Sequence, residues 1–489
     1  MWCNAAPEIP FDEMTFFQAL TDLARRFPSK PAIVAGQSLG YAELRQQVLE
    51  AAAGLSSAGV NAQAVVGISI ADEVQHLIAS LSLLILGCRQ LTLASFDSLA
   101  LRTRLADRAG VTTILTDDGD LAIDNRTAVL WPCRGDASSL RIENDPDRTV
   151  IVLKTSGTTG DLNLVGFSGA QLAAQARRHA DYADERLLRL ASIEHNNSKR
   201  HRLYCTLMGG TNVFRHGAIT SIADLCRADE VTCLDISRMH AADLVRQAAG
   251  PGVLLGGIKL RTGGSAVPAE LRAELQQRVT PLLFVRYAAT ECGAIAMAGP
   301  GEHDGIDCVG RLLPGVQLET VDAAGEPLPP GTAGRIRLKA EGMAEGYLDS
   351  PADTARRFRD GWFYPGDMGE FDEAGLLYVR GREDDMMILN GLNIFPAEIE
   401  RVLESHPAVK VAAALPLRSP VHGDIPVAAV ELEAGQQVEP AELLQFARDR
   451  LMLRSPRRIL VLPNLPRTDQ GKILKRELQS LFAPKRDQQ

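Results

Sequence analysis

The residues with the clearest capacity for chemistry form a short loop that reads TSGTTG from Thr155 to Gly160. The loop directly follows the apolar run 150–153 and contains four hydroxyl side chains and two glycines. Glycines let backbone N–H groups face an anion, and Ser and Thr hydroxyls add donors. The pattern therefore predicts a phosphate-binding turn after a strand, with an ordinary polar turn as the alternative. It is not a Walker A loop, because GxxxxGK[ST] is absent.

Three further motifs follow this loop along the chain. They read YAATECG at 287–293, GWFYPGDMGEFDEAGLLYVRGREDDMMILNGLNIFPAEIE at 361–400 and PRTDQGKILKREL at 466–478. Together with the loop they resemble the adenylate-forming superfamily of acyl-CoA and aryl-CoA ligases, luciferases and peptide-synthetase adenylation domains. The resemblance covers essentially the whole chain. It implies that a carboxylate attacks the α-phosphate of ATP, giving an acyl adenylate and pyrophosphate, and that the acyl group then passes to a thiol.

The resemblance also implies the nucleotide contacts. Tyr287 is expected to lie against adenine, and Thr290 to donate to a phosphate oxygen. Glu291 offers the hard oxygen that Mg²⁺ prefers. Asp367 is expected to accept from the ribose hydroxyls, with Arg382 as a second ribose contact. The residues expected to bind the nucleotide are Thr155, Ser156, Gly157, Thr158, Thr159, Gly160, Gly264, Tyr287, Asp367 and Arg382.

Three residues near the C-terminus resemble family positions that move during the reaction. Lys472 matches the catalytic lysine, which bridges the attacking carboxylate and the α-phosphate. Asp384 matches the hinge of a mobile C-terminal domain, and Gly391 matches the glycine beside the thiol tunnel, where a missing Cβ lets pantetheine approach. We therefore expect a nucleotide- and acyl-binding domain at 1–382 and a small lid domain at 383–489. A charged donor of the Lys472 kind is worth about 10² to 10³ in rate.

The phosphate loop departs from the family pattern at one place. Relatives commonly continue with Pro-Lys, whereas this chain has Leu162 and Asn163. Three interpretations follow: the lysine is dispensable, another cation such as Lys154 or a residue from 199–202 replaces it, or the protein binds ATP without turnover. The match at the other motif positions favours a working enzyme.

The acid is expected to contact the segment that follows the phosphate loop. Its EHNN sequence resembles the His-Asn pair of aryl-acid adenylases, so His195 is expected beside the carboxylate and Asn196 beside a polar ring substituent. A turn cap and a solvated basic face are the alternatives for this segment, and its KRHR residues at 199–202 could also receive a second carboxylate or coenzyme A phosphates. Ala288 replaces the usual glycine at the junction of the adenine and acyl sites.

The elements that must position these residues have an α/β pattern. Residues 16–115 alternate a helical face at 16–27 with short β-branched runs at 65–70 and 112–116, which predicts a largely parallel sheet. Similar strands are expected at 231–237, 252–260 and 281–288. Turn signals between short strands predict a β-rich, barrel-like subdomain from 301 to 382, and a helix at 396–407 opens the C-terminal α+β domain.

Bulk composition limits the class of protein. The chain has 489 residues, 45% of them hydrophobic, and a net charge of -9, which argues against a nucleic-acid-binding surface. Eight scattered cysteines suggest neither disulfides nor zinc. The N-terminus lacks a secretory signal pattern, and the apolar run 77–88 is too short to span a membrane. A cytoplasmic location and no membrane insertion are expected.

These observations predict an AMP-forming acid–thiol ligase that uses ATP, Mg²⁺ and, as the leading acceptor, coenzyme A. Its substrate is expected to be an aryl or small polar carboxylic acid. The catalytic residues are expected to be Lys472, Glu291, Thr290 and His195, and the acyl contacts His195, Asn196 and Ala288. The alternatives are an enzyme that loads the phosphopantetheine of an acyl carrier protein, an AMP-transferring enzyme without a thioester step, and a non-catalytic nucleotide-binding protein.

Overall fold

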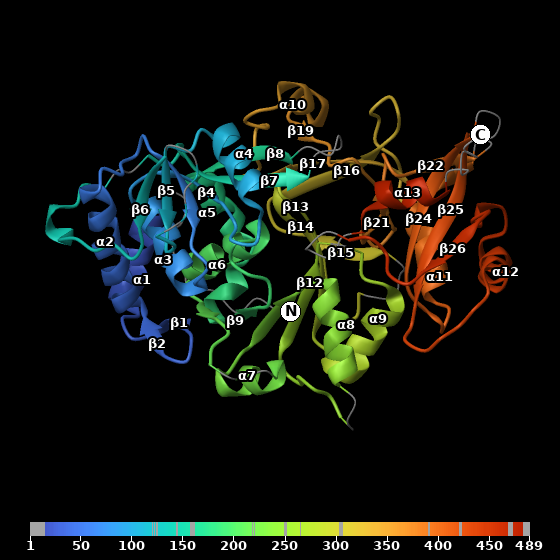
Figure 1. The fold of residues 1–489 in the computed structure, drawn as a ribbon, viewed down its shortest axis with the longest axis horizontal. Coiled ribbons are helices and arrows are strands. Elements are labelled where there is room, and N and C mark those ends of the chain that lie inside the picture. The colour runs from blue at the N-terminus through green and yellow to red at the C-terminus, as the bar shows by residue number, and fades with distance from the viewer. Residues whose placement is uncertain are drawn as a thin grey trace.

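The structure is a computed structural model that describes residues 15–119, 121, 123, 126–142, 145–156, 162–217, 219, 221–248, 252–264, 266–302, 307–389, 392–419, 423–467 and 473–482. It consists of an αβ body, a β-rich region and a set of C-terminal elements, which lie at the right of Figure 1. No helix within these ranges is both long and apolar enough to cross a membrane.

A six-stranded sheet carries the phosphate loop. Its strands, in spatial order, are β6 (Thr127–Leu130), β5 (Thr113–Thr116), β3 (Val65–Ser69), β4 (Arg89–Thr92), β7 (Thr149–Ser156) and β8 (Leu162–Ser168). The first five strands pair in parallel, as the alternating pattern predicted. β7 and β8 pair antiparallel with Thr155 opposite Asn163, so the phosphate loop is the connection of a hairpin.

Helices cover this sheet and separate it from the next one. They are α1 (Phe16–Arg26), α2 (Tyr41–Ser57), α3 (Glu73–Ile85), α4 (Leu99–Ala109), α5 (Gly169–Arg177) and α6 (Asn196–Met208). In α3, residues 76–85 are all buried, so most of the apolar run 77–88 lies in a core helix. α6 contacts α1, α3 and α5, so its side chains are enclosed by helices. α6 ends at Gly209, whose φ of +86° is a left-handed C-cap that glycine adopts without strain.

A second, larger sheet runs through the rest of the body. Its αβ part contains β2 (Ser38–Gly40), β1 (Pro31–Val34), β10 (Thr211–Val213), β9 (Arg186–Arg189), β11 (Cys233–Ile236), β12 (Lys259–Gly263), β13 (Leu283–Ala289) and β14 (Gly293–Ala298), with helices α7 (Ile222–Ala228), α8 (Arg238–Gln247) and α9 (Ala269–Glu274). The strand predicted at 252–260 was wrong in extent, because β12 begins only at Lys259. Turns precede it, and Gly257 adopts a φ of +88° there.

The β-rich region predicted at 301–382 is confirmed as antiparallel strands joined to the larger sheet through β14. It contains β15 (Cys308–Leu312), β16 (Val316–Val321), β17 (Gly334–Ala340), β18 (Phe358–Arg359), β19 (Trp362–Phe363), β20 (Asp367–Phe371) and β21 (Leu377–Arg382), together with α10 (Pro351–Arg357). The pairing of β13 with β14 therefore places the YAATECG segment where the αβ and β-rich regions meet.

The C-terminal elements form their own sheet and core. They are β22 (Met387–Leu389), β23 (Leu392–Ile394), α11 (Pro396–Glu404), β24 (Val409–Ser419), β25 (Gly423–Leu432), α12 (Pro440–Leu451), β26 (Ile459–Leu462) and α13 (Lys475–Phe482). On α11, Ile399 and Leu403 are buried against this sheet. Two ion pairs join α11 to the body: Arg401 Nη1 lies 2.8 Å from Asp307 Oδ2, and Arg238 Nη2 lies 2.9 Å from Glu404 Oε2.

Candidate active site

The expected ribose contacts lie together where β20 and β21 pair. Asp367 and Arg382 face one another across these strands, and Arg382 Nη1 donates to Asp367 Oδ1 at 3.1 Å. The hydroxyl of Tyr287, from β13, donates to Asp367 Oδ2 at 2.5 Å. Burial raises the pKa of Tyr287 well above its usual value, and the charge on Asp367 raises it further. The phenol therefore stays protonated and fixes the orientation of the carboxylate.

Glu291 lies at the other end of the same segment, in the turn after β13. Its carboxylate Oε1 accepts from the hydroxyl of Tyr347 at 2.7 Å and from Thr155 Oγ1 at 3.4 Å. Thr155 is in β7, next to the phosphate loop, so this contact brings two separate motifs together. Glu291 is 7% exposed. The turn thus places a buried carboxylate and a hydroxyl beside the start of the loop.

Two arrangements here were not predicted from the sequence. Tyr347, in the EGYL segment, holds the Glu291 carboxylate, and burial raises the pKa of its phenol well above the usual range. Arg200, in α6, donates from Nη1 to the backbone oxygen of Thr290 at 2.8 Å. Tyr347 has no spacing that marks it in the chain, and Arg200 was expected only as part of the KRHR segment, as a substitute cation or an anion contact. Each meets the turn only through tertiary packing. Both restrain the turn that carries Thr290 and Glu291.

The expected acyl contacts begin α6 and lie against β7. His195 is the N-cap of the helix, and its ring centroid is 4.8 Å from that of Phe96. Burial and then the charge on Lys154 lower the pKa of His195, which favours a neutral imidazole at neutral pH. The amide of Asn196 donates to the backbone oxygen of Lys154. The His-Asn pair is therefore held beside the strand that leads into the phosphate loop.

Asn163, at the position of the missing lysine, does not point to an open cleft. Its amide donates to Asp353 Oδ2 at 3.0 Å, and the residue is 7% exposed. This hydrogen bond lowers the pKa of Asp353. Of the cations considered as replacements, Lys154 pairs with Asp97. Its ammonium group is therefore already engaged.

The other candidate cations lie inside α6. Lys199 donates to Thr92 Oγ1 at 3.1 Å, and Arg202 donates to the backbone oxygen of Val213 at the same distance. Both side chains are fully buried. Replacement of the loop lysine by Lys199 or Arg202 thus has no support from these contacts.

The remaining expected site residues are distributed as follows. Ala288 lies in β13 beside Tyr287, and Gly264 follows β12 with a φ of +85°, a conformation that favours glycine. The expected hinge residue Asp384 lies between two arginines, 3.4 Å from Arg357 Nη2 and 3.6 Å from Arg382 Nη2. The side chain of Ser156 and the whole of Gly157, Thr158, Thr159, Gly160, Gly391 and Lys472 lie outside the described residues.

The described residues contain no group of three or more His, Cys, Asp or Glu side chains that could hold a metal ion. A Mg²⁺ ion commonly binds one or two carboxylates and completes its coordination with water and substrate phosphates. A single buried carboxylate beside the phosphate loop fits that mode, so Glu291 is the residue that would hold it.

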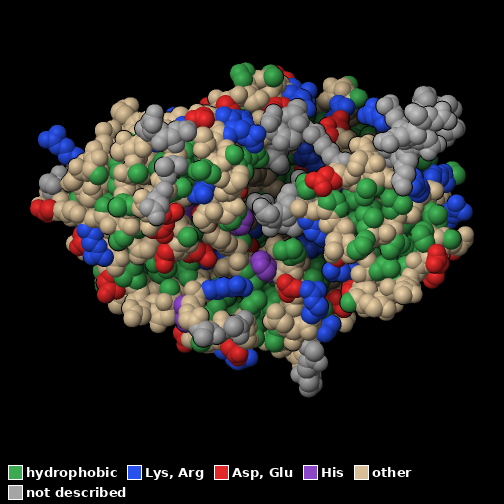
Figure 2. Space-filling view, in the orientation of Figure 1, with side chains coloured by type: hydrophobic (Ala, Val, Ile, Leu, Met, Phe, Trp, Pro, Cys, Tyr) green, Lys and Arg blue, Asp and Glu red, His purple; other side chains and the backbone are tan. Residues whose placement is uncertain are grey.

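The face that carries these residues is hollowed. Figure 2 shows a hollow between the body and the C-terminal elements, with histidine and basic side chains along its edge.

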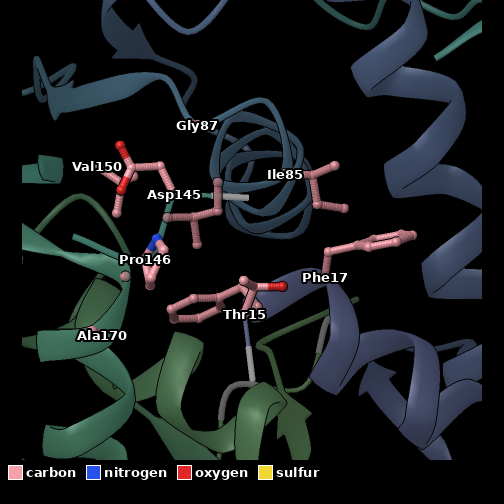
Figure 3. Close-up of a pocket in the computed structure, with 11 residues that line it drawn as sticks. Thr15, Phe17, Ile85, Gly87, Asp145, Pro146, Val150 and Ala170 are labelled. Atoms are coloured by element: carbon pink, nitrogen blue, oxygen red, sulfur yellow. The ribbon is translucent and has the colours of Figure 1, made fainter. Parts of the chain in front are cut away.

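A separate cavity of about 40 Å³ lies between α1, the end of α3 and the start of α5, lined by Phe17, Ile85 and Val150 among others (Figure 3). It has room for only one or two water molecules. This small cavity is therefore not part of the candidate site.

Models of two protein families match this chain. A family described as AMP-binding enzyme matches residues 20–348, and one described as AMP-binding enzyme C-terminal domain matches residues 398–472. The indoleacetate–CoA ligase of Aromatoleum aromaticum is 28% identical over 361 residues, covering 72% of this chain and 71% of that protein. The feruloyl-CoA synthase of an Amycolatopsis species is 31% identical over 349 residues, covering 69% of this chain and 70% of that protein.

A solved structure has the same fold. The o-succinylbenzoate coenzyme A synthetase of Bacillus subtilis, in complex with ATP and magnesium ion, superposes with a TM-score of 0.84. The superposition covers 94% of this chain and 99% of that one, at 24% identity. At this identity the likeness bears on the fold, and it confirms the predicted combination of a large αβ and β-rich body with a small C-terminal part.

Proposed function

The chain belongs to the AMP-binding enzyme family, and from this premise we propose that it joins a carboxylic acid to coenzyme A through an acyl adenylate, using ATP. The relatives named as CoA ligases support both half-reactions. The observation that carries the proposal is one segment of β13 and its turn. Tyr287 at one end contacts the ribose candidate Asp367, and Glu291 at the other contacts Thr155 beside the phosphate loop.

In the first half-reaction, a carboxylate oxygen of the acid forms a bond to the α-phosphorus of ATP while the bond to the bridging oxygen of pyrophosphate breaks. Asp367 and Arg382 hold the ribose, and Tyr287 keeps Asp367 in position. Thr155 and Thr290 supply hydroxyl donors to phosphate oxygens. Lys472 is proposed to place its ammonium group where negative charge develops at the α-phosphate.

Glu291 is proposed to bind Mg²⁺, which neutralises charge on the phosphate oxygens when bound. Tyr347 then acts as a positioning residue, because its hydroxyl holds one oxygen of Glu291. The other carboxylate oxygen is the one we assign to the ion. Hard carboxylate oxygen is the ligand type that Mg²⁺ prefers.

In the second half-reaction, the thiolate of coenzyme A attacks the acyl carbonyl carbon, and AMP leaves with the electron pair of the broken C–O bond. We propose that residues 383–489 form the lid that rotates about Asp384 between the half-reactions, with Gly391 beside the thiol. Asp384 pairs with Arg357 and Arg382 of the body, so rotation requires that these ion pairs exchange. His195 and Asn196 are proposed to contact an aryl or small polar acid.

We propose a cytoplasmic location. All seven described cysteines are free, which favours a reducing compartment such as the cytoplasm.

The test is pyrophosphate release from ATP, measured with the full chain, Mg²⁺ and a panel of aryl and short-chain acids. We expect release that depends on one class of acid, AMP as the second product, and a thioester when coenzyme A is added.

A thioester formed only with a phosphopantetheinylated carrier protein would assign the acceptor to that carrier, and adenylate formation without either thioester would indicate AMP transfer alone. Tight ATP binding without release across the panel would contradict the proposal and favour a nucleotide-binding protein, the alternative raised by Asn163.

A further inference from the structure

A group of buried arginines lies next to the turn that carries Thr290. We call it the arginine cluster; its members are Arg178, Arg189, Arg200, Arg261 and Arg286, each 8% exposed or less. They come from the end of α5, from β9, α6, β12 and β13. Arginine is almost never fully buried unless a partner compensates its charge, so a group of five requires an explanation.

Sheet register places three of these side chains on one face. Asp235 in β11 is paired with Arg189 on one side and with Arg261 on the other. Arg286 is paired with Gly263, which is two residues beyond Arg261 and therefore on the same face. Arg189 Nε lies 3.4 Å from Ser198 Oγ, so this face is the one packed against α6.

The carboxylates around the cluster are too few to balance it. Asp235 is buried and accepts from Arg189 at 2.6 Å and from Arg286 at 3.1 Å. Arg261 pairs with Asp181, whose side chain is 47% exposed. Two carboxylates thus pair directly with the five guanidinium groups, and Glu185 and Glu341 act on Arg261 and Arg178 without pairing with them directly.

The other two arginines have neutral hydrogen-bond partners. Arg200 donates to the side-chain oxygen of Gln175 and to the backbone oxygen of Thr290. Arg178 donates to the backbone oxygens of Cys292 and Ala294, at 2.6 and 3.0 Å. These carbonyl and amide oxygens satisfy donors but do not cancel charge.

The histidines of this region do not change the net charge of the cluster. His179 and His201 are buried, with ring centroids 4.8 Å apart, and Tyr182 contacts His201 Nδ1 at 2.7 Å. Burial, and then the charges of the neighbouring arginines, lower the pKa of both histidines well below the usual value, so they are neutral. The field at this face is therefore positive.

Some buried donors of the cluster have no partner among the described residues. They are Nε and Nη1 of Arg261 and Nε of Arg178. Arg261 instead lies over the ring of Tyr182, with Cζ 4.9 Å from its centroid. Buried polar atoms in folded proteins are hydrogen-bonded in the large majority of cases. These donors of Arg261 and Arg178 show that the described residues do not fully compensate the guanidinium groups of the cluster.

The cluster adjoins the reaction centre through α6. Arg200, on this helix, holds the backbone of Thr290, whereas Arg286 faces the helix from β13, on the opposite face of that strand to Tyr287. α6 also begins at His195 and Asn196, one turn before Arg200. An acid whose reacting carboxylate lies near His195 and Thr290 is therefore bound next to the helix that the cluster faces.

Resting on the proposed function, we infer that the acid carries a second carboxylate, which Arg200 and Arg286 recognise as specificity-determining residues. Arg189 and Asp235 position Arg286 in this arrangement. A guanidinium and a carboxylate form paired, charge-assisted hydrogen bonds, which are stronger than neutral ones. A neutral acid of the same shape would leave the cluster without its counter-charge.

The test compares each dicarboxylic acid with its own monomethyl ester, for example terephthalate and adipate with their half-esters, in the pyrophosphate-release assay. With the unaltered chain we expect kcat/KM to be about 10²-fold higher for the best dicarboxylate than for its half-ester, because hydrogen bonds to charged groups are the strong ones. Equal values, or a preference for the half-ester, would overturn the inference while leaving the proposed function intact. Absence of release with every acid would overturn the proposed function itself, and the inference with it.

Variants identify the residues. Arg286→Met is expected to reduce the ratio of diacid to half-ester at least about 10-fold, and Arg286→Lys to restore part of it, because the charge returns without the planar fork. Arg278→Met is the matched control, since Arg278 pairs with Glu274 and lies outside the cluster. An unchanged ratio in a folded Arg286→Met protein would contradict the assignment of Arg286.

Discussion

The nucleotide site and the arginine cluster differ in how their charges are matched. Around the ribose candidate, the carboxylate of Asp367 has a cation in Arg382 and a neutral donor in Tyr287. In the cluster, the guanidinium groups outnumber the carboxylates, and donors of Arg261 remain unpartnered. In the first arrangement both carboxylate oxygens of Asp367 have donors, whereas the second has an excess of positive charge. We infer that the nucleotide site supports the reaction for any acid and that the cluster selects among acids.

The largest effect is expected from Lys472→Ala, which removes the proposed catalytic charge. The rate of adenylate formation should fall about 10² to 10³-fold. The fall should be the same for a dicarboxylate and for its half-ester, because the change lies on the nucleotide side. Pyrophosphate release for both acids checks this, with Lys475→Ala as control because Lys475 already pairs with Glu400 at 2.7 Å.

If Lys472→Ala reduced the rate by different factors for the dicarboxylate and its half-ester, Lys472 would take part in acid selection. The nucleotide site and the arginine cluster would then not have separate roles. An unchanged rate would remove Lys472 from the chemistry.

Asp367→Ala is expected to raise the KM for ATP by about 10 to 10²-fold, because it removes charge-assisted hydrogen bonds to the ribose and leaves Arg382 without its partner. The KM for the acid and the ratio of diacid to half-ester should stay close to their original values. Asp243→Ala is a suitable control, since Asp243 lies on α8 in an exposed pair with Arg246. A shift in acid preference would show that the two sites are not separate.

Lys199→Met tests whether buried cations on α6 reduce stability when no anion compensates them. Burial lowers the pKa of Lys199 to about 7. The unfolded chain, with a lysine pKa of about 10.4, therefore binds the proton that the folded chain lacks between about pH 7 and 10, and stability decreases as the pH falls through this window.

The methionine variant should be more stable at pH 7, by about 1–4 kcal/mol, and its stability should depend less on pH across that window. Thermal unfolding from pH 7 to pH 10 measures both effects, with Lys475→Met as control. A lower Tm for Lys199→Met at every pH would mean that the amine stabilises the fold.

Asn163→Lys should have the smallest effect. Because the side chain at 163 faces Asp353, the new ammonium group should pair with that carboxylate rather than reach the phosphates. The KM for ATP should change less than about fivefold, the value of a modest ion pair. ATP titration of the rate measures it. A much larger decrease in KM would instead show that the missing lysine weakens the nucleotide site.

The sequence predicted which residues of the candidate nucleotide site lie together better than it predicted the surroundings of the acyl candidates, for a physical reason. Tyr287, Glu291, Asp367 and Arg382 stand in compact motifs, each a strand end or a turn whose local geometry fixes the side chain. The alternation of helices and strands likewise predicted the parallel sheet, although the strand at 252–260 proved shorter because a turn at Gly257 precedes β12.

The arginine cluster could not be predicted in this way. Arg189, Arg261 and Arg286 are widely separated along the chain, and only the order β9, β11, β12 and β13 in the sheet brings them to one face. The KRHR segment looked like a solvated basic face, but residues 199–202 are all buried, because α6 is enclosed between its neighbours. Tyr347 was not predicted, because only the fold brings the EGYL segment to the turn after β13 that carries Glu291.

The most direct test of the central claim is mass spectrometry of a single turnover, with the full chain, ATP, Mg²⁺ and a dicarboxylic acid but no coenzyme A. The proposed function predicts a protein-bound species with the mass of the acyl adenylate and one equivalent of pyrophosphate, both formed about 10² to 10³-fold more slowly with Lys472→Ala. It also predicts conversion of that species to thioester and AMP when coenzyme A is added. Intact ATP, or ADP with inorganic phosphate, and no adenylate from any acid would contradict it.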